Sequence, residues 1–250
     1  MTGDVDPARP VAAVPQVRTP FTPPQPYTAA DELRHGDSPV EAWWWWGSAT
    51  IDAGRRAGLF VGFELRGRRF DYWAGLVREH EPYLYIEELD GTGLREGLTI
   101  KPPEMWAGHD CDAPFRQWSL GNEAHGVLLD DPTEVWRRAH GVPVPVTFDV
   151  EWHATEPAEP LVGAPGAGGY RQVGEIDARI ELTEGVVEMV GPAERVHVWG
   201  VPFLPSSFAM PTDLYDLRAP YRRSDGTCVD QVLTVPPSGA RWWANWRSSR

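Results

Sequence analysis

Four tryptophans stand at adjacent positions, Trp43 to Trp46, in the run EAWWWWGSAT. Neighbouring side chains of a β-strand point to opposite faces, so Trp43 and Trp45 cover one face while Trp44 and Trp46 cover the other. A strand that is apolar on both faces lies between two packed layers, or between a core and an apolar ligand cavity. We favour packing on both sides for the quartet as a whole, because large aromatic side chains mostly belong to cores.

Alternation of apolar and polar residues predicts an all-β fold. Residues 142–153, VPVPVTFDVEWH, carry an apolar side chain at every second position, and residues 59–65 alternate in the same way. Pro143 and Pro145 cannot donate a ladder hydrogen bond, so we expect the first of these strands to begin at a sheet edge. Further strands are predicted at 43–51, 57–67, 69–77 and 83–89, and three more within 170–200, separated by turns at Glu184-Gly185 and Gly191-Pro192. One short helix is predicted at 130–140, DDPTEVWRRAH, from its acidic N-cap and the proline in its first turn.

Changes in composition divide the chain into four parts. Residues 1–30 are rich in proline and predict an extended arm, whereas residues 155–169 are rich in glycine, proline and alanine and predict a linker. Around the linker we expect an N-terminal β-lobe, residues 31–154, and a C-terminal β-lobe, residues 170–250.

The charge of the chain argues against two classes of partner. A net charge of -13 and a sequence pI near 4.9 repel nucleic-acid phosphates and anionic lipids, so we expect neither nucleic acid nor a membrane as partner. Two cysteines without motif spacing, and no recognisable signal peptide, predict a reduced, cytoplasmic protein. We expect a monomer or a homodimer.

The sequence carries none of the common cofactor or nucleophile motifs. Dinucleotide, P-loop, zinc-protease, nucleophile-elbow and paired-cysteine signatures are absent. Residues 109–112, HDCD, are metal-ligand types, but four consecutive strand residues do not turn toward one ion, so a polar loop is the preferred interpretation. We therefore predict no cofactor and no metal ion.

Several blocks, taken in order, resemble the lipocalin-like family related to carotenoid 1,2-hydratases (hydroxyneurosporene synthases). The blocks are WAGHDCDAPFRQWSLGNEAHGVLLDDP (106–132), VPVTFDVEW (144–152), GYRQVGEID (169–177) and RVHVWG (195–200). The resemblance runs from about residue 41 to about residue 200. In the last block Val196 stands where the family pattern RDHSWG has an acidic residue.

The resemblance implies an antiparallel lipocalin-like barrel or sandwich of two calycin-like lobes, with the tryptophan-rich strand beside the first cavity. It also implies cofactor-free chemistry on polyenes or polyketides, namely hydration of an isoprenoid double bond or cyclisation, including Diels–Alder ring closure. The absence of cofactor motifs agrees with this expectation.

Such chemistry requires a buried acid of raised pKa and aromatic walls that stabilise developing positive charge. The candidate catalytic residues are Glu41, Asp110, Glu123 and His197. The candidate substrate-binding residues are Trp44, Trp46, Glu64, Trp73, Arg195 and Trp199. Arg195, His197 and Trp199 share one strand face, and a face that meets water is an equally good interpretation of this pattern.

The sequence thus predicts a cofactor-independent cyclase, isomerase or hydratase that shapes a hydrophobic isoprenoid or polyketide-like molecule in a tryptophan-lined pocket, in natural-product biosynthesis. The alternative from another class is a non-catalytic carrier of a hydrophobic ligand.

Overall fold

The structure is a computed structural model that describes residues 27–36, 38–95, 97–132, 140–161, 168–201, 218–223 and 225–232. The strands in these residues are β1 (Val40–Thr50), β2 (Arg56–Arg66), β3 (Arg69–Arg78), β4 (Leu84–Thr92), β5 (Leu98–Ile100), β6 (Met105–Ala113), β7 (Gln117–Leu129), β8 (Gly141–Ala154), β9 (Glu159–Pro160), β10 (Gly168–Leu182), β11 (Gly185–Val201), β12 (Arg218–Arg222) and β13 (Cys228–Val232). Two short 3-10 helices, η1 (Ala29–Glu32) and η2 (Asp52–Gly54), complete the regular structure of the described part. The predicted all-β class is confirmed.

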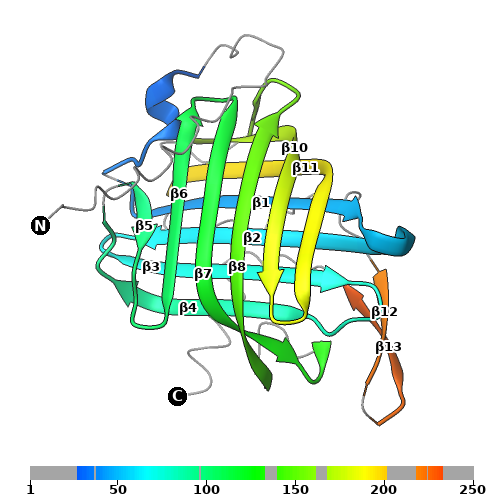
Figure 1. Cartoon of the computed structure of the whole chain (residues 1–250). Coiled ribbons are helices and arrows are strands. Elements are labelled where there is room, and N and C mark those ends of the chain that lie inside the picture. Colours follow the sequence, from blue (N-terminus) through cyan, green and yellow to red (C-terminus); the bar gives the residue numbers. More distant parts are fainter. Residues whose placement is uncertain are drawn as a thin grey trace, which may run out of the picture.

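Eleven strands form one antiparallel sheet that folds into two crossing layers (Figure 1). Strands β1 to β4 lie in one layer, and β6, β7, β8, β10 and the first half of β11 cross them in the other. The sheet is closed into a ring at two places. Trp43 of β1 lies opposite His197 of β11, and Leu84 of β4 lies opposite Leu128 of β7. This arrangement confirms the predicted antiparallel barrel or sandwich.

The strand β8 begins at a sheet edge, as its two prolines predict. β7 pairs with β8 along its whole length, including Pro143 and Pro145, whereas β10 pairs only from Val146 onward. The first residues of β8 therefore have only one neighbouring strand. Pro143 and Pro145, which lack an N–H group, interrupt no hydrogen bonds to β10.

The predicted turn at Gly191-Pro192 is wrong, because both residues lie inside the continuous strand β11. Pro192 fits there because it pairs with Glu175 of β10, while the pairing with β1 starts only at Ala193. Gly191 lies at a close crossing, since an added Cβ would come 2.1 Å from the backbone oxygen of Ser48. The glycine and proline mark the point where β11 passes from one layer to the other, and the predicted turn before Gly185 is confirmed.

All four tryptophans of β1 are buried, with exposed fractions of 1–2%. Trp43 and Trp45 belong to the apolar cluster between the two layers. Trp44 and Trp46 belong to a second apolar cluster on the opposite face of the same strand. Packing on both faces, predicted from the quartet, is confirmed.

The segment 155–169 does not divide the sheet. β8 before it and β10 after it pair directly from Val146 to Ala154, and β11 pairs with β1, so strands from both predicted lobes belong to one sheet. The hairpin β12–β13 forms a separate two-stranded sheet. Residues 1–26 of the predicted arm and 133–139 of the predicted helix lie outside the described residues. No helix in the described part has the length and apolar character needed to cross a membrane.

Candidate functional site

A buried polar cluster occupies one end of the ring, where β1, β10 and β11 meet the segment 27–36. Arg195 and His197 of β11 point into the ring, because Val196 and Val198, which alternate with them along the strand, belong to the cluster on the other face. Both basic side chains are 0–1% exposed. The shared face predicted for them is therefore confirmed, and the interpretation that this face meets water is wrong.

Arg195 forms a buried ion pair with Glu32, the last residue of η1. The Arg195 Nη1 donates to Glu32 Oε2 over 2.8 Å, and the Arg195 Nη2 donates to Glu32 Oε1. The backbone N–H of Phe115 also donates to Glu32 over 2.6 Å, as does the Trp118 indole over 3.2 Å. Gln172 accepts from the Arg195 Nε over 3.1 Å, so the pair is hydrogen-bonded on both sides.

Aromatic rings enclose the guanidinium of Arg195. Its central carbon lies 4.7 Å from the ring centre of Trp152 and 5.0 Å from that of Tyr170. Burial alone would raise the pKa of Glu32, but the charge and hydrogen bonds of Arg195 outweigh it and hold the pKa below its usual value. Glu32 and Arg195 are thus both ionised inside the protein.

Tyr170 connects this ion pair to His197. The Tyr170 hydroxyl donates to Glu32 over 2.7 Å, and its oxygen lies 3.3 Å from the Nδ1 of His197. Because the only hydroxyl proton goes to the ionised Glu32, the Tyr170 oxygen accepts from His197, whose Nδ1 therefore carries a hydrogen. The other ring nitrogen, Nε2, lies 2.9 Å from the Oε1 of Glu41.

Glu41 of β1 and His35 complete what we call the Glu41–His197 site: His35, Glu41, Tyr170, His197 and Trp199. Glu41 accepts from the backbone N–H of His35 over 2.9 Å, and its Oε1 lies 2.8 Å from the Nδ1 of the His35 ring. The His35 ring is stacked on Trp199 with ring centres 4.2 Å apart, and its side chain is 25% exposed. The site is therefore closed toward the interior and reached from solvent past His35.

Burial and hydrogen bonding have opposite effects on the pKa of Glu41 and on the pKa of His197. Burial alone would raise the pKa of Glu41, but the hydrogen bonds from His197 and His35 outweigh it and lower the pKa below its usual value. Burial lowers the pKa of His197 below its usual value, and the hydrogen bond and charge of Glu41 offset only part of that effect. Since the Nδ1 of His197 already carries a hydrogen, the contact between Nε2 and Glu41 needs a positive centre, such as a second proton, between them.

The other predicted binding residues lie on a different face. Trp44, Trp46 and Trp73 belong to the second apolar cluster, so the structure does not bring them to His197. Glu64 lies on the same outer side of β2, next to Asp71 across the β2–β3 pair. Burial, followed by the charge of Asp71, raises the pKa of Glu64 to about 7, as expected for a buried acid.

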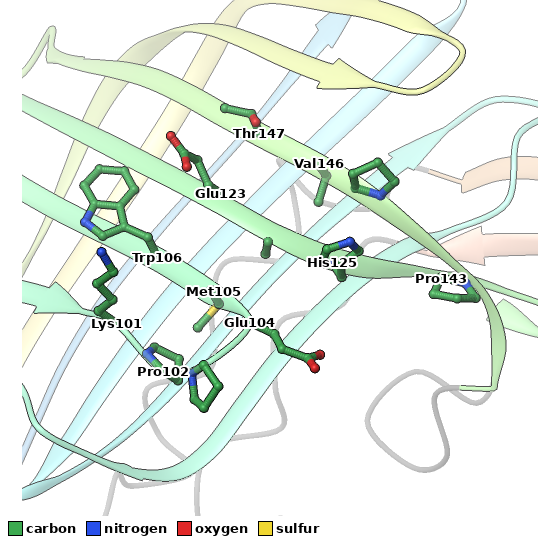
Figure 2. Close-up of a pocket in the computed structure, with 13 residues that line it drawn as sticks. Lys101, Pro102, Glu104, Met105, Trp106, Glu123, His125, Pro143, Val146 and Thr147 are labelled. Atoms are coloured by element: carbon green, nitrogen blue, oxygen red, sulfur yellow. The ribbon is translucent and has the colours of Figure 1, made fainter.

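Asp110 and Glu123 are exposed and lie away from the Glu41–His197 site. Residues 109–112 are part of strand β6 and not the predicted polar loop, because the pairing of β6 with β7 continues to Asp110. Glu123 lies on the outer face of β7 in an open groove of about 970 Å³, beside Trp106 and His125 (Figure 2). Neither acid takes part in the buried cluster.

The interior beside β1 is filled by side chains. The cavity described there measures about 10 Å³ and is lined by residues that include Trp45, Leu59 and Ile176. A volume of this size holds about one water molecule at most. In this part of the described interior, the tryptophans form a packed core and leave no ligand-sized hollow.

Sequence reasoning missed Glu32, His35, Tyr170 and Gln172. One signal was available, because a buried arginine requires a carboxylate partner and Arg195 has the strand position of an inward-facing residue. The sequence separation of 163 residues between Arg195 and Glu32 hides which carboxylate that is.

Comparisons with known proteins give one structural match and no family. No protein-family model matches the chain, and no curated protein matches it. Among solved structures, one match is "a putative AttH (NE1406)" from Nitrosomonas europaea, with 14% identity and a TM-score of 0.45. The match covers 72% of this chain and 58% of that one, so this chain spans less than two thirds of the matched protein.

Proposed function

We propose that the chain is a cofactor-independent enzyme that transfers protons on a hydrophobic, isoprenoid or polyketide-like small molecule at the Glu41–His197 site. It would act as a cyclase, isomerase or hydratase in natural-product biosynthesis. The observation that carries the proposal is the 2.9 Å contact between the Nε2 of His197 and Glu41. This contact needs a proton, and an imidazole–carboxylate pair that shares a proton is a typical acid–base device.

The surrounding contacts support these roles. Hydrogen bonds from Arg195 to Glu32, from Tyr170 to Glu32 and from His197 to Tyr170 fix the ring of His197. The ring then carries hydrogen on Nδ1, and a second proton lies between its Nε2 and Glu41. His197 would donate the Nε2 proton to a carbon or oxygen of the substrate. Glu41 would accept a proton from the product carbon, or from the attacking water in a hydration, so the enzyme regains its starting protonation.

Aromatic faces support binding of an electron-poor intermediate. The His197 ring is stacked on Trp43 with centres 4.4 Å apart, and the Trp199 ring lies tilted against it with centres 4.8 Å apart. Indole faces stabilise a nearby cation by about 1–2 kcal/mol when water is excluded. A substrate that replaces His35 against Trp199 would meet this surface.

A non-catalytic carrier is the second candidate. Like a substrate, its ligand would have to bind against Trp199 in place of His35, because the cavity of about 10 Å³ beside β1 is too small for one. The buried acid–base pair, in contrast, has no role in simple storage, so we favour the enzyme.

The test uses the full chain, treated with a chelator, in heavy water with geraniol, farnesol and lycopene. Proton transfer would place deuterium on product carbon, which mass spectrometry detects. We expect His197→Gln to lower the rate by about 10²–10⁴-fold while binding, measured by tryptophan fluorescence, is retained.

His125→Gln is the matched control, because His125 is an exposed histidine in the outer groove. Binding of these compounds without turnover would contradict the enzyme and support the non-catalytic carrier. Equal turnover by the wild type and His197→Gln would remove His197 from the chemistry, and neither binding nor turnover would exclude the isoprenoid class.

A further inference from the structure

We infer that His35, Glu41 and His197 form a binding site for one divalent transition-metal ion of the zinc class. The inference goes beyond the proposed function and does not rest on it. It starts from three side chains of different elements that meet at one point: His35 follows η1, Glu41 lies on β1 and His197 lies on β11.

The three donor atoms have the spacing of a metal site. One ligand atom from each residue lies within 4.8 Å of the other two. The Oε1 of Glu41 is 2.8 Å from the Nδ1 of His35 and 2.9 Å from the Nε2 of His197. Ligands at 2.0–2.1 Å from a tetrahedral ion are about 3.3 Å apart. The two contacts of Glu41 would each lengthen by about half an ångström, and the two nitrogens, which lie within 4.8 Å of each other, would take the same spacing. Two imidazoles and one carboxylate are a known zinc ligand set that leaves one position open.

The hydrogen bond behind His197 is the one that metal-bound histidines use. A metal-ligating imidazole donates its other N–H to a carboxylate or hydroxyl, which fixes the tautomer. Here the Nδ1 of His197 donates to Tyr170, Tyr170 donates to Glu32, and Arg195 neutralises Glu32. The lone pair on Nε2 is thereby directed at Glu41.

The charge balance of the site also favours a cation. Glu32 has Arg195 as its partner, whereas Glu41 accepts from the backbone N–H of His35 and otherwise contacts two imidazole nitrogens. Glu41 is 2% exposed, so the site holds a buried carboxyl group without a fixed positive partner. A divalent ion at the junction of the three donors supplies that charge and separates the facing lone pairs of His197 and Glu41.

The metal ion and the shared proton would occupy the same position and exclude each other. Zinc therefore inhibits the proton transfer of the proposed function, and the chelated protein is the form in which that transfer is measured. Binding of the metal ion requires no substrate, so it is tested separately from proton transfer.

The test is a titration of the chelator-treated full chain with Zn²⁺ by isothermal calorimetry, and with Co²⁺ by visible absorption. We expect one ion per chain and absorption bands of a four-coordinate Co²⁺ site. His35→Gln removes a ligand at a partly exposed position and should weaken Zn²⁺ binding at least about 100-fold, and Tyr170→Phe should weaken it about 10–100-fold. His125→Gln, at an exposed histidine of the outer groove, should leave affinity unchanged.

The melting temperature of each variant shows whether it is folded, and His35→Gln serves as the ligand variant that leaves the buried ion pair intact. Zn²⁺ affinity that is equal in the wild type and in His35→Gln would overturn the inference. A stoichiometry above one that falls in His125→Gln would also overturn it, because the ions would then be held by surface histidines. Metal binding without turnover would support the metal site and contradict the proposed function. Turnover without metal binding would support the proposed function and contradict the metal site.

Discussion

Arg195→Met should lower the free energy of unfolding by about 3–5 kcal/mol. The substitution leaves Glu32 as an unpaired carboxylate at a fully buried position, where it still accepts from Phe115, Trp118 and Tyr170. Breaking a buried ion pair from one side is costly because the remaining charge keeps its desolvation penalty. Urea unfolding followed by tryptophan fluorescence measures the change.

Two further variants test this explanation. Arg179→Met removes an arginine that pairs with Glu181 at the surface, where it is half exposed, and should change the stability by about 0.5 kcal/mol or less. The double variant Glu32→Gln with Arg195→Met removes both charges and should recover most of the loss. A cost of less than about 1 kcal/mol for Arg195→Met alone would show that the pair is not buried as described.

Glu64→Gln should stabilise the protein above neutral pH and have little effect near pH 5. The pKa of Glu64 is raised to about 7 in the folded chain, from an ordinary value of 4.5. The folded state therefore holds this proton more tightly than the unfolded state, and stability falls as pH rises from about 4.5 to about 7. A shift of this size corresponds to roughly 3 kcal/mol, which the glutamine removes.

The measurement is urea unfolding of the wild type and Glu64→Gln at pH 5 and pH 8. Arg66 keeps its ion pair with Asp71 in the variant, so the contribution of Arg66 to stability is largely retained. Glu123→Gln, at an exposed position, should show no pH-dependent difference from the wild type. If Glu64→Gln is less stable than the wild type at pH 8 by as much as at pH 5, Glu64 is ionised at both values and the burial account fails.

The strands could be predicted from the sequence because alternation is a local property. Val144, Val146, Phe148, Val150 and Trp152 occupy alternate positions along β8, and the structure buries all five, whereas Val142 at the start of the same alternation is exposed. The turn predicted at Gly191-Pro192 failed because a glycine at a close strand crossing and a glycine in a turn look alike in sequence. Only the pairing of β11 with β1 separates the two cases.

The candidate site could be predicted in part, for the same reason. Arg195 and His197 share a face of one strand, and Glu41 precedes the tryptophans on a second strand, so local patterns single them out. Trp44, Trp46 and Trp73 were assigned to the same pocket because β1 is apolar on both faces, and alternation does not say which face meets the interior. Glu32 ends the short helix η1 and His35 follows it, so only their long-range contacts with β10 and β11 reveal their roles.

One arrangement underlies the site: Tyr170 donates to Glu32 and accepts from His197. Long-range ¹H–¹⁵N NMR of the metal-free protein reports directly which ring nitrogens of His197 carry hydrogen, with His197→Gln used for assignment. The account predicts a protonated Nδ1, together with an Nε2 whose shift shows a proton shared with Glu41. A neutral ring with a bare Nδ1 would contradict it, because the relay from Arg195 to Glu41 would then be broken at Tyr170.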